Sequence, residues 1–302
     1  MDKITVIIPV YNRADLIEKA IQSVKDQIHR DFDCILVNDC STDNSVPTIE
    51  KLIAGDDRFS ILSHTVNKGV GAARNTGIQA ATTTYISFLD SDDYYHKDFL
   101  FESHELLKNA ASKPDLILTG CIYYFDDALT NIKEFIPRKP DAKRLKIKYP
   151  FIYDRGFGTG NGLVLSKKIF DKYGLFDERL KAAGDTDFFI RIEDLKGFKI
   201  IEKPLIYINR TGGEHLSRNW SKLAEAYEHM IVKNHSIING EQLLKNLWYY
   251  KLMWLSYRAN NKKLARKCLS HLNFNGKAML LASIYETFPK KLAISLHKKI
   301  SG

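Results

Sequence analysis

The apolar positions in the first 90 residues form two alternating patterns. Short continuous runs rich in β-branched residues predict strands buried on both faces, at residues 4–10, 34–37, 59–62 and 85–89. Apolar spacings of three and four predict helices between them, at residues 16–27 and 46–53, and a small-residue helix entered through residues 67–77. Because strand and helix alternate in this way, the sequence predicts an α/β fold with a largely parallel sheet and helices on both faces.

The pattern continues less regularly after this first part. It predicts two helices and four strands, at residues 98–110 and 167–173 and at residues 116–118, 122–125, 163–165 and 199–208. The periodicity lapses over residues 126–150, and a run this long within a compact domain is typical of a functional loop or lid, with a plain surface excursion as the alternative.

Beyond residue 220 only helical spacings occur. They predict helices at residues 223–238, 242–257, 264–272, 278–288 and 292–300. We therefore expect an α/β domain over residues 1–219 and a helical appendage over residues 220–302.

The charge is divided unevenly between these two regions. The chain carries a net charge of +9, yet residues 222–302 alone hold 14 Lys and Arg against 4 Asp and Glu. Basic residues interleaved with Trp and Tyr are typical of helices that lie in the headgroup layer of an anionic membrane. A helical bundle or a dimer interface with a charged outer face is the alternative. The neutral, acid-lined first region argues against nucleic acid as a partner.

The sequence also bears on compartment and redox state. No segment reaches the ~18 to 20 apolar residues of a membrane span, and the N-terminus has no signal pattern. We expect a cytoplasmic protein that lies peripherally on the inner face of the membrane. The four cysteines have no C-x-x-C spacing, so they indicate neither a zinc site nor a disulfide framework.

The strand over residues 85–89 ends on three carboxylates within four residues, at Asp90, Asp92 and Asp93. Carboxylates this close repel each other unless a divalent cation lies between them and a phosphate. Hard oxygen ligands suit Mg²⁺ or Mn²⁺, which share their coordination with substrate phosphates. The alternative is a solvated acidic turn that caps the next helix.

Four segments at predicted strand ends together resemble the family 2 glycosyltransferases of GT-A fold. They are VIIPVYN at residues 6–12, VNDCSTD at 37–43, NKGVGAARNTG at 67–77 and FLDSDD at 88–93. The resemblance covers roughly residues 3–215, and the order of the four motifs makes it specific.

The resemblance implies a nucleotide-sugar pocket and a metal site. The pocket residues would be Pro9, Tyr11, Arg13, Asp39, Arg74, Asp90 and Ser91. Asp39 would accept a hydrogen bond from the uracil edge, with helix capping by Asp39 and Asp43 as the alternative, and a solvated position as the alternative for Arg74. Mn²⁺ or Mg²⁺ would be held by Asp90 and Asp92, with His215 as a third ligand or an ordinary surface group.

Residues 183–191 resemble the family's Gly-Glu-Asp-x-Asp-Phe stretch, whose central Asp is the general base. Asp185 is that residue here, and Gly184 stands in place of the family's Glu, a departure that concerns the acceptor contact. Asp185 and Asp187 would also stabilise the first turn of a helix through its dipole. If Asp187 only caps the helix, replacing it by Asn should cost about 1 kcal/mol.

By resemblance, the chain is an inverting glycosyltransferase. It would move a sugar from a nucleotide-diphosphate donor, UDP above all, to a hydroxyl of a glycan or lipid-linked glycan, with residues 126–150 as an acceptor-side loop. A homo-oligomer is possible. A nucleotidyltransferase would need a glycine-rich basic signature near the N-terminus, and a dinucleotide oxidoreductase a G-x-G-x-x-G after the first strand, and neither is present. A non-catalytic membrane- or glycan-binding module is the remaining alternative.

Overall fold

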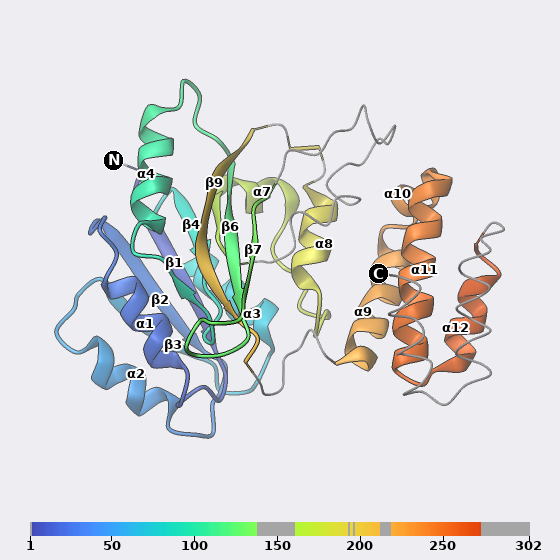
Figure 1. The fold of residues 1–302 in the computed structure, drawn as a ribbon, viewed down its shortest axis with the longest axis horizontal. Coiled ribbons are helices and arrows are strands. Elements are labelled where there is room, and N and C mark those ends of the chain that lie inside the picture. Colours follow the sequence, from blue (N-terminus) through green and yellow to red (C-terminus); the bar gives the residue numbers. More distant parts are fainter. Residues whose placement is uncertain (1, 138–160, 193, 196, 212–218, 273–302) are drawn as a thin grey trace. The chain divides into compact units, whose positions relative to one another are not determined.

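The computed structural model describes residues 2–137, 161–192, 194–195, 197–211 and 219–272 (Figure 1). The chain divides into two compact units. Unit 1 comprises residues 1–179 and 184–213 and contains the sheet, and unit 2 comprises residues 180–183 and 214–302 and contains the C-terminal helices. The helices predicted over residues 278–288 and 292–300 lie outside the described residues.

Unit 1 is built on a nine-stranded mixed sheet in the order β3-β2-β1-β4-β8-β6-β9-β5, with β7 paired to β6. The strands are β1 (Ile4–Val10), β2 (Phe32–Asn38), β3 (Phe59–Ser63), β4 (Tyr85–Phe88), β5 (Tyr94–Tyr95), β6 (Leu116–Tyr124), β7 (Ile132–Phe135), β8 (Leu163–Ser166) and β9 (Phe198–Asn209). The first four run parallel to one another, and β8 then pairs antiparallel with both β4 and β6. The predicted α/β class is confirmed.

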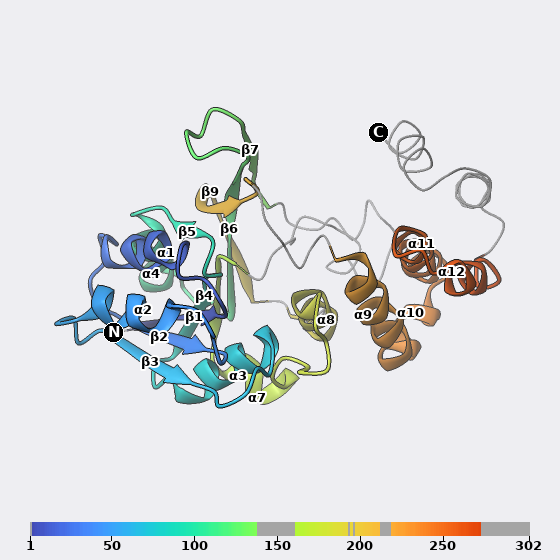
Figure 2. The ribbon, with the colours of Figure 1, turned by 90° about the horizontal axis from the view of Figure 1, so that it is seen from below.

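Helices cover both faces of this sheet (Figures 1 and 2). One face packs against α1 (Ile17–Lys25), α2 (Ser45–Ile53) and α4 (Phe99–Asn109), and the other against α3 (Val70–Ala80), α7 (Lys168–Tyr173) and α8 (Gly184–Arg191). Val6 and Ile8 of β1 belong to the first core and Ile7 to the second. Since successive side chains of a strand point to opposite faces, a strand between two helical layers must be apolar throughout, which explains the continuous apolar runs.

Helix α3 lies unusually close to the central strand. A Cβ added at Gly77 would lie only 2.4 Å from Cγ2 of Ile7, so a glycine is required at this contact. The close packing holds α3, and with it Arg74 one turn earlier, against β1 near the site described below.

The structure differs from the predicted elements in four places. The two-residue strand β5 was not predicted. β6 is one strand, where two were predicted, because the register shift around Gly120 is a bulge in its pairing with β9 rather than a break. β7 lies within residues 126–150, where no element was predicted. The predicted helix 223–238 is two helices, interrupted at Asn234.

Unit 2 is a helical assembly of α9 (Trp220–Lys233), α10 (His235–Gly240), α11 (Gln242–Arg258) and α12 (Lys262–Leu269). Helix α11 packs against α9 and α12 and buries Trp248, Tyr249 and Tyr257. These three rings are therefore packed inside unit 2, and their side chains do not form its surface. Of the helices that the structure describes, none is long and apolar enough to cross a membrane.

Candidate active site

The parallel part of the sheet brings three predicted segments to one edge. The chain leads from β1 to β2 and β3 on one side, and returns to the other side of β1 at β4, so the strand order reverses beside β1. Ligands of open α/β sheets bind at such a point, beyond the carboxyl ends of the strands. The Asp39 amide donates to the Val10 carbonyl at 2.8 Å, and the Leu89 amide to the Ile7 carbonyl at 3.1 Å. Pro9 is buried within β1.

The loops that follow β1 and β2 are hydrogen-bonded to each other. The Thr42 amide donates to Oδ1 of Asn12 at 2.8 Å, and the Arg13 amide to Oγ of Ser45 at 2.7 Å. Asn12 has a φ of 51°, in the left-handed region, which is sparsely populated and often found at functional sites. Asp43 accepts from the Ser45 amide at 3.0 Å and from the Ala14 amide at 3.1 Å, so its carboxylate also joins the two loops.

Asp39 lies at the start of the loop after β2 and is only 3% exposed. Its Oδ1 accepts from the Lys68 amide at 2.8 Å and its Oδ2 from the Gly69 amide at 2.7 Å, where α3 begins. His64 contributes a third contact, with Nδ1 2.7 Å from Oδ1. The carboxylate therefore joins the edge of the sheet to the helix N-terminus, where a negative charge is stabilised.

Arg74 reaches from α3 to the acidic segment after β4. One of its guanidinium nitrogens donates to Oδ1 of Asp90 at 2.8 Å. The guanidinium lies 5.6 Å from the ring centroid of Phe88 and 5.5 Å from that of Phe176, and Arg74 is 7% exposed. A cation held between two rings and a carboxylate is not a solvated surface residue, so that alternative is wrong.

Two buried side chains, Asn161 and Asp93, fix the position of the acidic segment through hydrogen bonds. The Asp90 amide donates to Oδ1 of Asn161 at 2.9 Å, and Nδ2 of Asn161 donates to Asp93. Asp93 also accepts from the Asn209 amide at the end of β9, at 2.8 Å. Burial, and then the charges of Asp90 and Asp92, raise the pKa of the Asp93 carboxyl well above its usual range. Asp93 is thus a buried structural member of the triplet.

Asn161 is not among the predicted site residues, although its place in the sequence carried a signal. Asn161 precedes Gly162, which has a φ of 75° and donates its amide to the Phe88 carbonyl at 3.3 Å. A Cβ at Gly162 would lie 1.6 Å from Cδ1 of Ile206, so this turn requires glycine. The glycines within residues 156–162 are typical of a turn. No nearby residue in the sequence indicated that Asn161 would accept a hydrogen bond from the Asp90 amide.

The triplet offers oxygen ligands of the kind that Mg²⁺ and Mn²⁺ prefer. Asp90 and Asp92 are partly exposed, whereas Ser91 and Asp93 are buried. The charges of Asp90 and Asp92 add to the effect of burial in raising the pKa of Asp93, and a divalent cation would offset this negative charge. Within the described ranges, no three His, Cys, Asp or Glu side chains are arranged to hold a metal ion. Asp90 and Asp92 are the partly exposed carboxylates that could hold such an ion, with phosphate and water completing its coordination. His215 lies outside the described residues.

The two carboxylates in the first turn of α8 have different surroundings. Asp185 is partly exposed, and its Oδ1 accepts from the neighbouring Thr186 amide at 2.9 Å. Asp187 is fully buried and forms an ion pair with Nε of Arg191 at 3.0 Å. Arg191 also donates to the carbonyls of Gly174 and Leu175, each at 2.9 Å. Asp187 is therefore more than a helix cap, and we expect its replacement to cost more than the about 1 kcal/mol of a lost cap.

Helix α8 is connected to the acidic segment through aromatic packing. The ring of Phe188 on α8 lies 5.2 Å from that of Phe176, and Phe176 lies 5.5 Å from the ring of Phe88 just before Asp90. Arg74 packs on the same two rings, Phe88 and Phe176. Asp185 thus lies on a helix that is fixed to the aromatic cluster supporting Arg74 and the acidic triplet.

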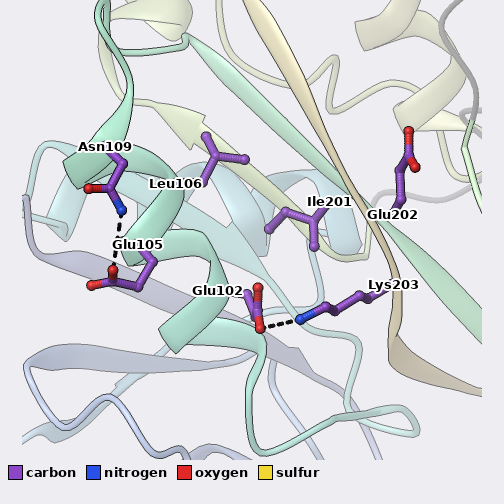
Figure 3. A pocket seen from close by; sticks show the side chains of 7 residues that line it. All are labelled: Glu102, Glu105, Leu106, Asn109, Ile201, Glu202 and Lys203. Carbon is purple, nitrogen blue, oxygen red and sulfur yellow. Dashed lines mark hydrogen bonds and ion pairs between the residues drawn. The ribbon is translucent and has the colours of Figure 1, made fainter.

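A surface groove of about 400 Å³ lies between α4 and β9 (Figure 3). It is lined by Glu102, Glu105, Leu106, Asn109, Ile201, Glu202 and Lys203. Glu102 and Lys203 form an ion pair at 2.5 Å. Along β9 the groove lies six or more residues before Asn209, or about 20 Å at the usual rise of a strand, so it is separate from the acidic segment.

The fold and site together define an α/β protein with an acidic edge at the point where open α/β sheets bind their ligands. The sequence model for "Glycosyl transferase family 2" matches residues 5–174, and the chain belongs to this family. It is 31% identical over 226 residues to the amylovoran biosynthesis glycosyltransferase AmsB of Erwinia amylovora, covering 70% of this chain and 72% of that protein. It is 27% identical over 248 residues to the uncharacterized glycosyltransferase EpsJ of Bacillus subtilis, covering 75% of this chain and 70% of that one.

Two solved structures share the fold. S. aureus TarS 1–349 in complex with UDP-GlcNAc aligns with a TM-score of 0.59 and 18% identity, over 89% of this chain and 72% of that one. The mannosyltransferase PcManGT from Pyrobaculum calidifontis, in complex with GDP-Man and Mn²⁺, aligns with a TM-score of 0.56 and 15% identity, over 99% and 79%. The predicted family, its GT-A fold and its glycosyltransferase class are confirmed.

Proposed function

We propose that this chain is an inverting, metal-assisted glycosyltransferase that moves one sugar from a UDP-sugar to a hydroxyl of a glycan or lipid-linked glycan. The observation that carries the proposal is the meeting of Asp39, Arg74 and the triplet from Asp90 at the edge of the sheet beside β1. This edge combines a hydrogen-bond acceptor for the nucleotide base with a pair of carboxylates suited to a cation that is bound to a diphosphate.

At the donor end, Asp39 accepts a hydrogen bond from an N–H of the base. Tyr11, which is 45% exposed, and Arg13 line the base and the ribose. The Arg13 loop is fixed by its bond to Ser45, so the pocket is formed before the ligand arrives. TarS was solved with UDP-GlcNAc and PcManGT with GDP-Man, which supports a nucleotide-sugar donor for this chain.

At the diphosphate, Asp90 and Asp92 would hold Mn²⁺ or Mg²⁺. The bound ion would neutralise the charge that develops on the departing diphosphate. Arg74 keeps the Asp90 carboxylate in one orientation through its bond at 2.8 Å. Asn161 fixes the Asp90 backbone at 2.9 Å, so the ligand pair is pre-organised. A contribution from His215 remains a prediction.

At the acceptor end, Asp185 acts as the general base. It takes the proton of the acceptor hydroxyl as that oxygen forms a bond to the anomeric carbon. The bond from the same carbon to the diphosphate oxygen breaks, and its electron pair leaves with the nucleoside diphosphate. One displacement of this kind inverts the anomeric centre and needs no covalent enzyme intermediate.

The test is hydrolysis of a panel of UDP- and GDP-sugars by the full chain with Mn²⁺ and no acceptor. We expect turnover of UDP-sugars, and its loss in Asp92→Asn and on chelation, because a single carboxylate binds the ion poorly. Asp57→Asn, at an exposed Asp outside the site, is the matched control and should keep full turnover. Unchanged turnover in excess EDTA would refute metal assistance, and turnover of GDP-sugars alone would refute the UDP assignment.

We also propose that α12 contacts an anionic membrane surface. Four basic side chains on this helix are exposed, at Lys262, Lys263, Arg266 and Lys267. Because each cation near an anionic bilayer contributes about 1 kcal/mol, the basic side chains of this one short helix give useful attraction. Contact with a membrane surface would suit an acceptor that is linked to lipid.

A further inference from the structure

A chain of three side chains, from the partly exposed Thr76 to the buried His64 and Asp39, links α3 to the loop after β2. His64, in the segment after β3, has its Nδ1 2.7 Å from Oδ1 of Asp39 and its Nε2 2.8 Å from Oγ1 of Thr76. The His64 and Asp39 side chains are 6% and 4% exposed. A carboxylate has no proton to give, so Nδ1 of His64 is the donor to Asp39. In the neutral ring Nε2 then accepts from the Thr76 hydroxyl, which selects the tautomer.

The chain decides which oxygen of Asp39 is left for a ligand. Oδ1 accepts from Nδ1 of His64 and from the Lys68 amide, whereas Oδ2 accepts from the Gly69 amide alone. Each carboxylate oxygen has two lone pairs in the plane of the group. Oδ1 is therefore saturated, and Oδ2 keeps one acceptor position.

We propose that His64 is a positioning residue for recognition of the nucleotide base. Its ring saturates and immobilises Oδ1 of Asp39, so that Oδ2 accepts the N–H of the base in a single geometry. Thr76 acts through His64 by fixing the proton on Nδ1. This inference rests on the proposed function, in which Asp39 contacts the base of the donor.

The inference predicts selectivity for the base as well as affinity. Uracil carries a proton on N3, whereas N3 of cytosine is an acceptor, so an aligned carboxylate favours UDP over CDP. If His64 had only a structural role, its replacement would weaken the binding of UDP and of CDP equally. The ratio of the two dissociation constants therefore separates positioning from folding.

The experiment is calorimetric titration of the full chain with UDP and with CDP. His64→Leu removes the buried donor and should weaken UDP binding by about 10- to 100-fold, with a similar fall in the preference for UDP over CDP. His64→Asn carries an amide N–H at the position of Nδ1 and should restore UDP affinity to within about 5-fold. His64→Gln moves that donor to the position of Nε2 and should behave like His64→Leu. The UDP affinity of Thr76→Val should lie between those of His64→Asn and His64→Leu.

Kinetics supply a second readout. Because Asp39 acts on the base and not at the reacting carbon, His64→Gln should raise KM for the donor and leave kcat within about 3-fold. Asp39→Asn is the reference variant for the base contact itself.

If Asp39→Asn leaves UDP affinity unchanged, the base assignment fails and the inference fails with it. If Asp39→Asn weakens UDP binding while His64→Leu and His64→Gln keep the preference for UDP over CDP, the inference alone is overturned. Equal weakening of UDP and CDP in the His64 variants overturns it as well, since that result describes a structural residue. Where His64→Leu does not fold, the comparison of His64→Gln with His64→Asn decides.

Discussion

Replacing the two carboxylates of α8 by amides should separate chemistry from scaffold. Asp185→Asn keeps the shape of the side chain but removes the proton acceptor. Asp187→Asn keeps the shape but removes the charge that balances Arg191 in a buried pair. The two positions lie two residues apart on one helix, so each variant is the matched control of the other.

The expected magnitudes follow from the surroundings of each side chain. Breaking a buried ion pair by removing one partner costs about 3 to 5 kcal/mol, and an amide oxygen that still accepts from Nε of Arg191 lowers this to about 2 to 3 kcal/mol. For a domain of this size, such a loss lowers the melting temperature by roughly 4 to 12 °C. Asp185 is partly exposed and bonded only to its neighbour's amide among its described contacts, so its replacement should change stability by less than about 1 kcal/mol.

The activity is expected to follow the opposite order. Loss of a general base lowers the rate by about 10² to 10⁴-fold, so Asp185→Asn should lose transfer to that extent while nucleotide affinity persists. Asp187→Asn should retain at least about a tenth of the activity at a temperature where it is folded. Thermal melts, nucleotide titration and initial rates of transfer, measured on both variants, give the comparison.

One pattern of results would refute the assignment. If Asp185→Asn transfers sugar at the native rate while a folded Asp187→Asn is inactive, the base is Asp187 and the ion pair with Arg191 must open in the reaction. If Asp187→Asn melts at the native temperature, the pair does not contribute the stability that its burial implies.

Three further outcomes are expected. Burial, and then the charge of the stacked His104, lower the pKa of His29. The stability that neutral His29 contributes is therefore complete above the ordinary histidine pKa of about 6.5 and is lost as the pH falls through the lowered pKa. Between pH 7.5 and 5 the melting temperature of the wild type should fall further than that of His29→Gln, and equal falls would contradict this. Gly162→Ala combines a positive φ with a Cβ contact of 1.6 Å and should lower the free energy of unfolding by at least about 2 kcal/mol. Gly55→Ala has a φ of 76° but nothing within 4 Å of the added Cβ, and should lower it by about 1 kcal/mol. Denaturant titrations compare the two variants, and similar losses would show that the contact at Gly162 relaxes. Reversing the four charges of α12 in the full chain should reduce flotation with anionic vesicles, which should also weaken with salt, and unchanged flotation would reject the membrane proposal.

The sequence determined the architecture of the parallel half of the sheet. A strand between two helical layers must be apolar at every position, so it appears in the sequence as an unbroken apolar run. This is why β1, β2 and β4 could be predicted. The acidic triplet was predicted for the same local reason, since an apolar run that stops on carboxylates marks a strand end. Family membership followed from the order of four such strand ends.

Tertiary structure alone decided how the carboxylates are held. Asn161 meets the Asp90 amide across 71 residues, and His64 meets Asp39 across 25, so no spacing in the sequence relates the partners. Asp187 and Arg191 stand one helical turn apart and read as an ordinary surface pair, and only the packing of α8 shows that the pair is buried. Hydrogen bonds between distant segments depend on where the fold brings the side chains, whereas strands and helices depend on the period of neighbouring residues.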